Sequence, residues 1–116
     1  MIIENEWLPI YYEGFWDVPS AFLTEYNGDL FLFWRDGFDE ELDDYPPNYK
    51  IYRVKNVSLK EAYEPREEPF EFVRLLNIPL LMENEIIGEI PTREVGFDQT
   101  KRKFIDRGIF KQLLKN

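Results

Sequence analysis

An Asn-Gly pair, Asn27-Gly28, separates two apolar runs and constrains the fold more than any other feature of the sequence. Asn-Gly favours a type I′ turn, because both central residues of that turn need a positive φ. The two flanking runs, residues 20–26 and 29–35, therefore predict a β-hairpin with a two-residue loop. Such a loop also fixes the register of the two strands.

This register places large apolar side chains on both faces of the hairpin. One face takes Tyr26 with Asp29, Thr24 with Phe31, Phe22 with Phe33 and Ser20 with Arg35; the other takes Glu25 with Leu30, Leu23 with Leu32 and Ala21 with Trp34. Strands that are apolar on both sides are usually central in a sheet that is covered on both faces. One cover could be a helix, and the other a second sheet layer, a long segment or a partner protein. The side chains that we expect to be buried are Phe22, Leu23, Leu30, Leu32, Phe33 and Trp34.

Shorter elements are predicted around the hairpin. Strands are expected at residues 8–13, 49–55 and 70–76, and residues 80–82 and 86–87 flank 83–85 as in a second hairpin. Ser58 with Glu61 three positions later forms a capping box and predicts a short helix over residues 58–63. Pro65 and Pro69 bracket a charged connection.

The C-terminal stretch has helical spacing. From Gln99 onward, apolar residues step by four, and Gly108 inside the stretch could divide it into two short helices. The expected fold class is α+β, an antiparallel β-meander of about five to six strands with a short helix and a C-terminal helix. The length of 116 residues favours one domain, 1–116.

Charge is distributed unevenly along the chain. It carries 14 basic and 23 acidic residues, a net charge of −9. Residues 98–116 hold six basic and two acidic residues, a net charge of +4, which leaves −13 in residues 1–97. The domain is thus expected to combine an acidic, mostly β part with a basic, helical C-terminus. An acidic body repels nucleic-acid phosphates and attracts basic partner surfaces, although solubility alone is the simpler explanation.

The missing residue types exclude several chemistries. Without cysteine and histidine, the chain has no disulfide, thiol nucleophile, Ser-His-Asp triad or imidazole-ligated metal site. No glycine-rich phosphate loop is present either. We therefore expect no catalytic residue, no cofactor and no bound metal, and a protein that is not an enzyme. With no signal-like N-terminus and no apolar run of membrane-spanning length, the expected location is the cytoplasm, with no contact to membrane or nucleic acid.

The candidate binding residues lie in an acidic stretch and among the N-terminal aromatics. The stretch departs from the EF-hand pattern, because glycine comes second after Asp36. It is either a solvated loop or a binding edge for a basic partner. Nearby tryptophans either pack in the core or anchor a partner, since Trp dominates interface hot spots. The candidate partner-binding residues are Asp36, Asp39, Glu40, Glu41, Asp43, Asp44, Tyr45, Trp7 and Trp16.

Two motifs resemble a known group of proteins. The first is Tyr11-Tyr12-Glu13-Gly14 followed by the aromatic hairpin, and the second is Ser58-Leu59-Lys60-Glu61-Ala62. Together they are similar to the opening of small bacterial domains of unknown function, over about the first 65 residues. The resemblance implies no activity and transfers no functional residue.

The function expected from these features is that of a small acidic protein-interaction module. Its concrete form would be an inhibitor or immunity-type protein of bacterial or phage origin that binds a basic-surfaced, nucleic-acid-handling protein. A DNA mimic is a sharper version of the same idea. The alternatives are a small carboxylate-dependent enzyme and an accessory subunit of a larger assembly.

Overall fold

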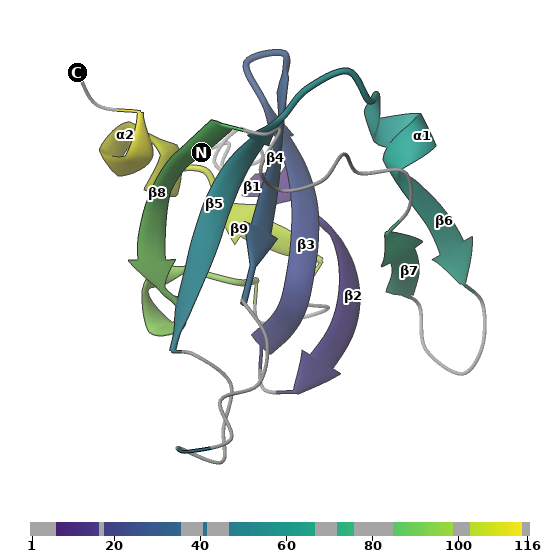
Figure 1. Cartoon of the computed structure of the whole chain (residues 1–116). Helices are drawn as coiled ribbons and strands as arrows, with labels where there is room; N and C mark the ends of the chain where they lie inside the picture. The colour runs from purple at the N-terminus through teal and green to yellow at the C-terminus, as the bar shows by residue number, and fades with distance from the viewer. Residues whose placement is uncertain are drawn as a thin grey trace, which may run out of the picture.

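The molecule is built around a five-stranded antiparallel sheet with the strand order β2-β3-β4-β5-β8. The computed structural model describes residues 7–16, 18–35, 41, 47–66, 72–75, 85–98 and 103–114. The sheet consists of β2 (Tyr11–Trp16), β3 (Val18–Tyr26), β4 (Asp29–Trp34), β5 (Asn48–Val54) and β8 (Glu85–Pro91). Figure 1 shows these strands side by side. The predicted α+β class with an antiparallel meander is confirmed.

The β3–β4 hairpin forms as the sequence predicts. Asn27 and Gly28 have φ values of 52° and 84°, so both central residues adopt the positive φ of a type I′ turn. Each predicted pair from Tyr26–Asp29 to Ala21–Trp34 is observed. The hydrogen bond from the Arg35 N–H to the Ser20 carbonyl, at 3.0 Å, extends the same register to the end of the strands.

One face of the sheet is covered by segments from both ends of the chain. The strands β1 (Trp7–Pro9) and β9 (Phe104–Asp106) pair into a ribbon, and the helix α2 (Ile109–Leu113) follows directly. Figure 1 shows the ribbon behind the sheet and α2 beside β8. The core on this face is mostly aromatic and includes Ile10, Phe22, Phe31, Phe33, Tyr49, Ile51, Ile90, Val95, Ile105, Ile109 and Phe110.

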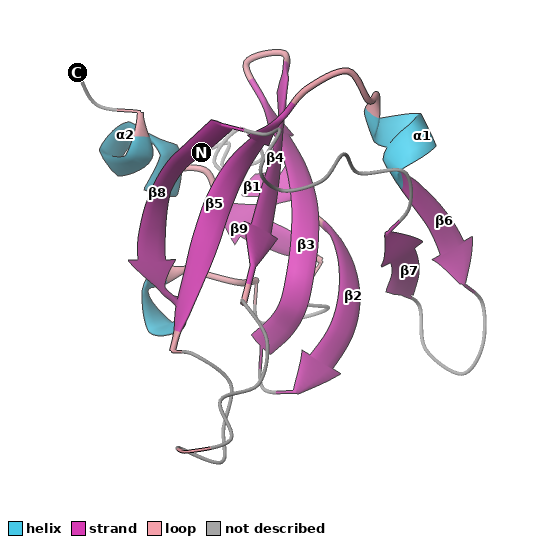
Figure 2. Cartoon of the chain, viewed as in Figure 1, coloured by secondary structure: helices cyan, strands magenta, loops and turns pink. Residues whose placement is uncertain are grey.

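The opposite face carries a second, more aliphatic core. Its cover consists of the short helix α1 (Leu59–Ala62) and a two-stranded unit, β6 (Tyr63–Arg66) paired with β7 (Phe72–Leu75). Figure 2 separates the helices from the strands and shows this unit on the side of β2. The buried residues here are Ala21, Leu23, Leu30, Leu32, Tyr52, Val54 and Ala62. Both faces are thus covered by the chain itself. Five of the six residues expected to be buried are buried, whereas Trp34 is only partly so.

The capping box of α1 is present. The Ser58 hydroxyl accepts a hydrogen bond from the Glu61 N–H, and the Glu61 carboxylate accepts one from the Ser58 N–H at 3.1 Å. The Ser58 hydroxyl also donates to the Glu61 carboxylate at 2.9 Å, and the hydrogen bonds that the carboxylate accepts from the Ser58 backbone and hydroxyl lower the pKa of Glu61. The helix is shorter than predicted at its C-terminal end, because Tyr63 begins β6.

The predicted charged connection after Tyr63 is partly wrong. Residues 63–66 form β6, in which Pro65 lies opposite Val73. A two-stranded unit tolerates this proline, since β6 has a free edge on the side away from β7 among the described residues. Of the predicted second hairpin, residues 80–82 lie outside the described residues. Glu85, expected in its turn, instead begins β8, which pairs with β5.

The C-terminal helix expected from Gln99 is wrong over residues 104–106, which form β9. Ile105 pairs with Leu8 of β1 and also forms a bridge with Phe97, so the segment gains strand partners on both sides. Helical structure starts only after Gly108, whose N–H donates to Asp106 Oδ1 at 2.8 Å. A short 3₁₀ helix (Thr92–Glu94) precedes this region. No helix among the described residues is long and apolar enough to span a membrane.

A prediction concerns the centre of the aromatic core. Phe33 is fully buried and stacks on Phe22 with ring centroids 4.5 Å apart. Replacing Phe33 by Ala should reduce the free energy of unfolding by about 3–5 kcal/mol, because the ring is lost and a cavity remains. Urea denaturation measures the change. Ile86→Ala serves as the control, since Ile86 is 61% exposed and its loss should change stability by less than about 0.5 kcal/mol. Equal effects of the two substitutions would contradict the central position of Phe33.

A second prediction concerns alkaline pH. Tyr49 is buried and its hydroxyl donates to the Pro19 carbonyl at 2.7 Å. Burial raises the pKa of Tyr49 far above its ordinary value of 10.0. The folded protein therefore keeps this proton when the unfolded chain loses it, and stability should fall as the pH rises above about 10. Tyr49→Phe should be less stable at neutral pH by about 1 kcal/mol, but should lose less stability on going to high pH. Urea denaturation at neutral and alkaline pH tests this, and identical pH dependence in both proteins would contradict it.

Candidate interaction surfaces

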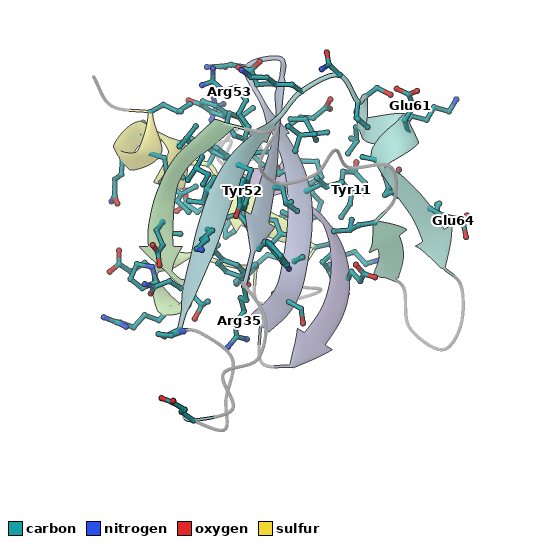
Figure 3. All side chains as sticks on the ribbon, in the orientation of Figure 1. Tyr11, Arg35, Tyr52, Arg53, Glu61 and Glu64 are labelled. Atoms are coloured by element: carbon teal, nitrogen blue, oxygen red, sulfur yellow. The ribbon has the colours of Figure 1, made fainter. Side chains whose placement is uncertain are left out.

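The acidic stretch that the sequence singled out joins β4 to β5. Only Glu41 of its acidic residues is described, and it lies exposed in a turn. The connection leaves the sheet at Arg35 and returns at Pro47, whose carbonyl accepts from the Thr92 N–H at 2.8 Å. Figure 3 shows Arg35 at this end of the sheet and Arg53 at the other end. The remaining predicted residues of this stretch, Asp36, Asp39, Glu40, Asp43, Asp44 and Tyr45, lie outside the described residues.

Among the described residues, nine acidic but only four basic side chains are in the exposed class. The exposed acidic residues are Glu13, Glu25, Asp29, Glu41, Glu61, Glu64, Glu89, Glu94 and Asp106. The exposed basic residues within the same ranges are Lys55, Lys60, Arg93 and Lys111. The described ranges nevertheless contain eleven acidic and eleven basic residues in all, and several of the Lys and Arg side chains are partly buried. The net charge of −9 therefore comes from residues outside the described ranges.

A pair of tyrosines lies where the sheet meets its aliphatic cover. Tyr11 of β2 stacks on Tyr63 of β6 with ring centroids 4.7 Å apart. Burial, followed by the neighbouring Tyr63 and Glu25, raises the pKa of Tyr11. Figure 3 shows Tyr11 facing the unit that carries Glu61 and Glu64. The two rings attach this cover to the sheet.

The two tryptophans proposed as anchors occupy different positions. Trp16 ends β2 and pairs with Val18, and the structure does not describe its side chain. Trp7 begins β1, where it lies directly opposite Asp106 of β9 and is half-buried. Leu8 and Ile105 pack against the aromatic core, so Trp7 lies on the outer face of the ribbon. The interpretation of Trp7 as a surface anchor stays a prediction, now with a defined location.

The structure adds one exposed aromatic that the sequence interpretation missed. Phe104 lies on the same outer face, opposite Pro9, and is 39% exposed. It was missed because residues 104–106 were assigned to a helix whose apolar face would include Ile105. Phe104 and Ile105 are residue types that favour strands, and this was the strand signal available from the sequence.

The described residues offer no cluster for metal binding. No group of three or more Asp or Glu side chains within the described ranges is arranged to hold a metal ion. The chain lacks the other common protein ligands, His and Cys.

Comparisons of the chain with protein-family models, with curated proteins and with solved structures found no match.

Proposed function

We propose that this protein is a small acidic interaction module of the cytoplasm, an inhibitor or immunity-type protein that binds a protein with a basic surface. The observation that carries the proposal is the net charge of −9 of the chain, together with the nine exposed acidic residues against four exposed basic ones in the described ranges. Complementary charge accelerates the diffusional encounter of two proteins and suppresses the binding of acidic competitors.

The covered sheet supports an interaction through loops and outer surfaces. The aromatic and aliphatic cores occupy the two faces of the five-stranded sheet, so its loops and outer surfaces remain accessible to a partner. Charged groups for a partner are available on the periphery, including Glu41 in the β4–β5 connection and Glu61 and Glu64 on the aliphatic cover. A nucleic-acid-handling protein is a natural partner, since such proteins carry a basic surface for phosphates. An inhibitor of this kind would compete with the nucleic acid for that surface.

The first test is affinity capture from the source cytosol at low and then high salt. A stoichiometric protein that is retained at low salt and released at high salt is the expected result, because the Debye length shrinks as salt is added. The captured protein should have a basic surface and should lose its nucleic-acid binding in the complex. Retention that is independent of salt would contradict an electrostatically driven interaction.

The same partner allows a test of the acidic stretch. The variant replaces Asp39, Asp43 and Asp44 by Asn and Glu40 and Glu41 by Gln. It should associate more slowly and with a weaker dependence on salt, since exposed charges act mainly on the on-rate. Stopped-flow association at two ionic strengths measures both effects. Equal on-rates for the variant and the wild type would remove the stretch from the interface.

A matched control separates local charge from total charge. It removes the same number of charges elsewhere, at the exposed residues Glu13, Asp29, Glu64, Glu89 and Glu94, by the same Asn or Gln exchange. If the β4–β5 connection is a binding edge, this control should slow association less than the loop variant does. Equal slowing by both variants would show that only the net charge matters. Unchanged melting temperatures establish that both variants remain folded.

A further inference from the structure

The outer face of the ribbon is apolar along its centre. Direct cross-strand pairs place their side chains on the same face, so Trp7, Pro9 and Phe104 share the face that points away from the aromatic core. Their neighbours Leu8 and Ile105 alternate to the inner face, where Ile105 is fully buried. We call the outer group, Trp7, Pro9 and Phe104 with the acidic residues beside them, the ribbon surface.

A third segment widens the ribbon on the far side of β9. Phe97 forms a bridge with Ile105, the Asp106 N–H donates to the Gly96 carbonyl at 2.8 Å, and the Asp98 N–H donates to the Phe104 carbonyl at 3.0 Å. Phe104 therefore has Pro9 on one side and Asp98 on the other. Asp106 in turn lies between Trp7 and Gly96. The apolar centre thus has a carboxylate on each of its two cross-strand rows.

Both carboxylates are held in place by the backbone. The Phe104 N–H donates to Asp98 Oδ1 at 2.8 Å, and the Gly108 N–H donates to Asp106 Oδ1 at 2.8 Å. Binding to such a group costs little ordering entropy, because its position is already restricted in the free protein. The negative charges of the ribbon surface are therefore fixed at the rim of its apolar centre.

The register of β9 forces Phe104 to remain outside. A shift by one residue would bury Phe104 and expose Ile105, which packs at the centre of the aromatic core. The main chain at Phe104 is also bonded to Asp98 through both its N–H and its carbonyl. An aromatic side chain that is 39% exposed on so constrained a strand has the rigidity expected of an interface anchor.

We propose that the ribbon surface docks a basic segment of the partner protein, in which a large apolar side chain is flanked by Arg or Lys. The inference rests on the proposed function, since it identifies where the basic partner is held. The apolar side chain contacts Phe104, Pro9 and Trp7, and the flanking cations face Asp98 and Asp106.

The occupant is basic because the charged side chains on the outer face of the described ribbon are these two carboxylates. Of the basic residues that flank β9, Lys103 alternates with Phe104 and lies opposite the buried Ile10. The other, Arg107, lies over the ring of Tyr26.

The test uses synthetic peptides of defined chemistry and the full-length protein labelled with ¹⁵N. The first peptide has a Phe-Leu centre flanked by arginines, the second replaces the centre by Ala-Ala, and the third replaces the arginines by glutamates. The first should shift the amide signals of β1 and β9 and the indole signal of Trp7. The other two should bind at least about tenfold more weakly, because each lacks one of the two contacts.

Two pairs of variants locate the contacts. Phe104→Ser should weaken binding of the first peptide by about tenfold or more, whereas Ile86→Ser, which removes a more exposed apolar side chain on β8, should leave it unchanged. Asp98→Asn with Asp106→Asn retains the Oδ1 acceptors but removes both charges, and should flatten the salt dependence. Glu13→Gln with Glu89→Gln, two exposed acids outside the ribbon, is the matched control and should retain that dependence. The melting temperature of each variant verifies its fold.

Several results would overturn the inference. They are the absence of binding by the first peptide at millimolar concentration, tighter binding of the glutamate peptide, shifts confined to residues outside the ribbon, or unchanged binding by a folded Phe104→Ser variant. Failure here is distinct from failure of the proposed function. If a captured basic partner binds the Phe104→Ser variant as tightly as the wild type, docking at the ribbon surface is contradicted but the proposed function as an acidic interaction module is not. If no salt-sensitive partner is captured, the proposed function itself is contradicted.

Discussion

The contact between Phe22 and Phe33 is the one on which the rest of the structure depends. The two residues face each other across β3 and β4, and their rings stack with centroids 4.5 Å apart. The same register places Leu23 against Leu32 on the other face, so a single hairpin supplies the centre of both cores. Since neither set of side chains can remain in water, each face needs its own cover, and the remaining segments of the described fold provide the two covers.

The aromatic side is closed by Phe110 of α2. Its ring stacks on Tyr26 with centroids 4.5 Å apart and contacts Phe31 at 4.9 Å. A guanidinium lies over each of these two partners: Arg107 over Tyr26 at 5.2 Å and Arg53 over Phe31 at 5.7 Å. The side chains of Arg107, Tyr26, Phe110, Phe31 and Arg53 thus lie next to one another in this order. This row of three rings between two guanidinium groups explains how a helix of only five residues is held on the sheet. Arg53 and Arg107, two of the basic residues of this acidic protein, therefore contribute to packing.

The local parts of this fold could be predicted from the sequence, and the long-range parts could not. The turn at Asn27-Gly28 and the Ser58–Glu61 capping box are each determined by residues that lie close together in the sequence, and the structure contains both. The strand β9 depends instead on β1, which comes from the opposite end of the chain. Without that partner, the spacing of Ile105, Ile109 and Leu113 favoured a helix. The strand β6 was missed for a similar reason, because Pro65 argues against a strand unless its partner β7 is known.

The same limit applies to the candidate site. Trp7 could be named from the sequence as a surface anchor because tryptophan is frequent at interfaces, yet its neighbours Phe104 and Asp106 follow only from the pairing of β1 with β9. Asp98 in turn belongs to the group only through its hydrogen bonds to Phe104. The constellation combines residues from both ends of the chain, and no local pattern in the sequence could have placed them together.

The two proposed contributions to binding differ in physical character. The carboxylates of the acidic stretch and the exposed acids act at long range, and their main effect is on the rate at which a basic partner arrives. The ribbon surface acts at contact distance, where burial of Phe104 and Trp7 would slow dissociation. A sheet whose two faces are already occupied by its own cores leaves such peripheral positions for recognition. The pairing of β1 with β9 therefore has two consequences. The inward residues Leu8 and Ile105 close the aromatic core, and the outward residues Trp7 and Phe104 form the face on which we propose that the partner docks.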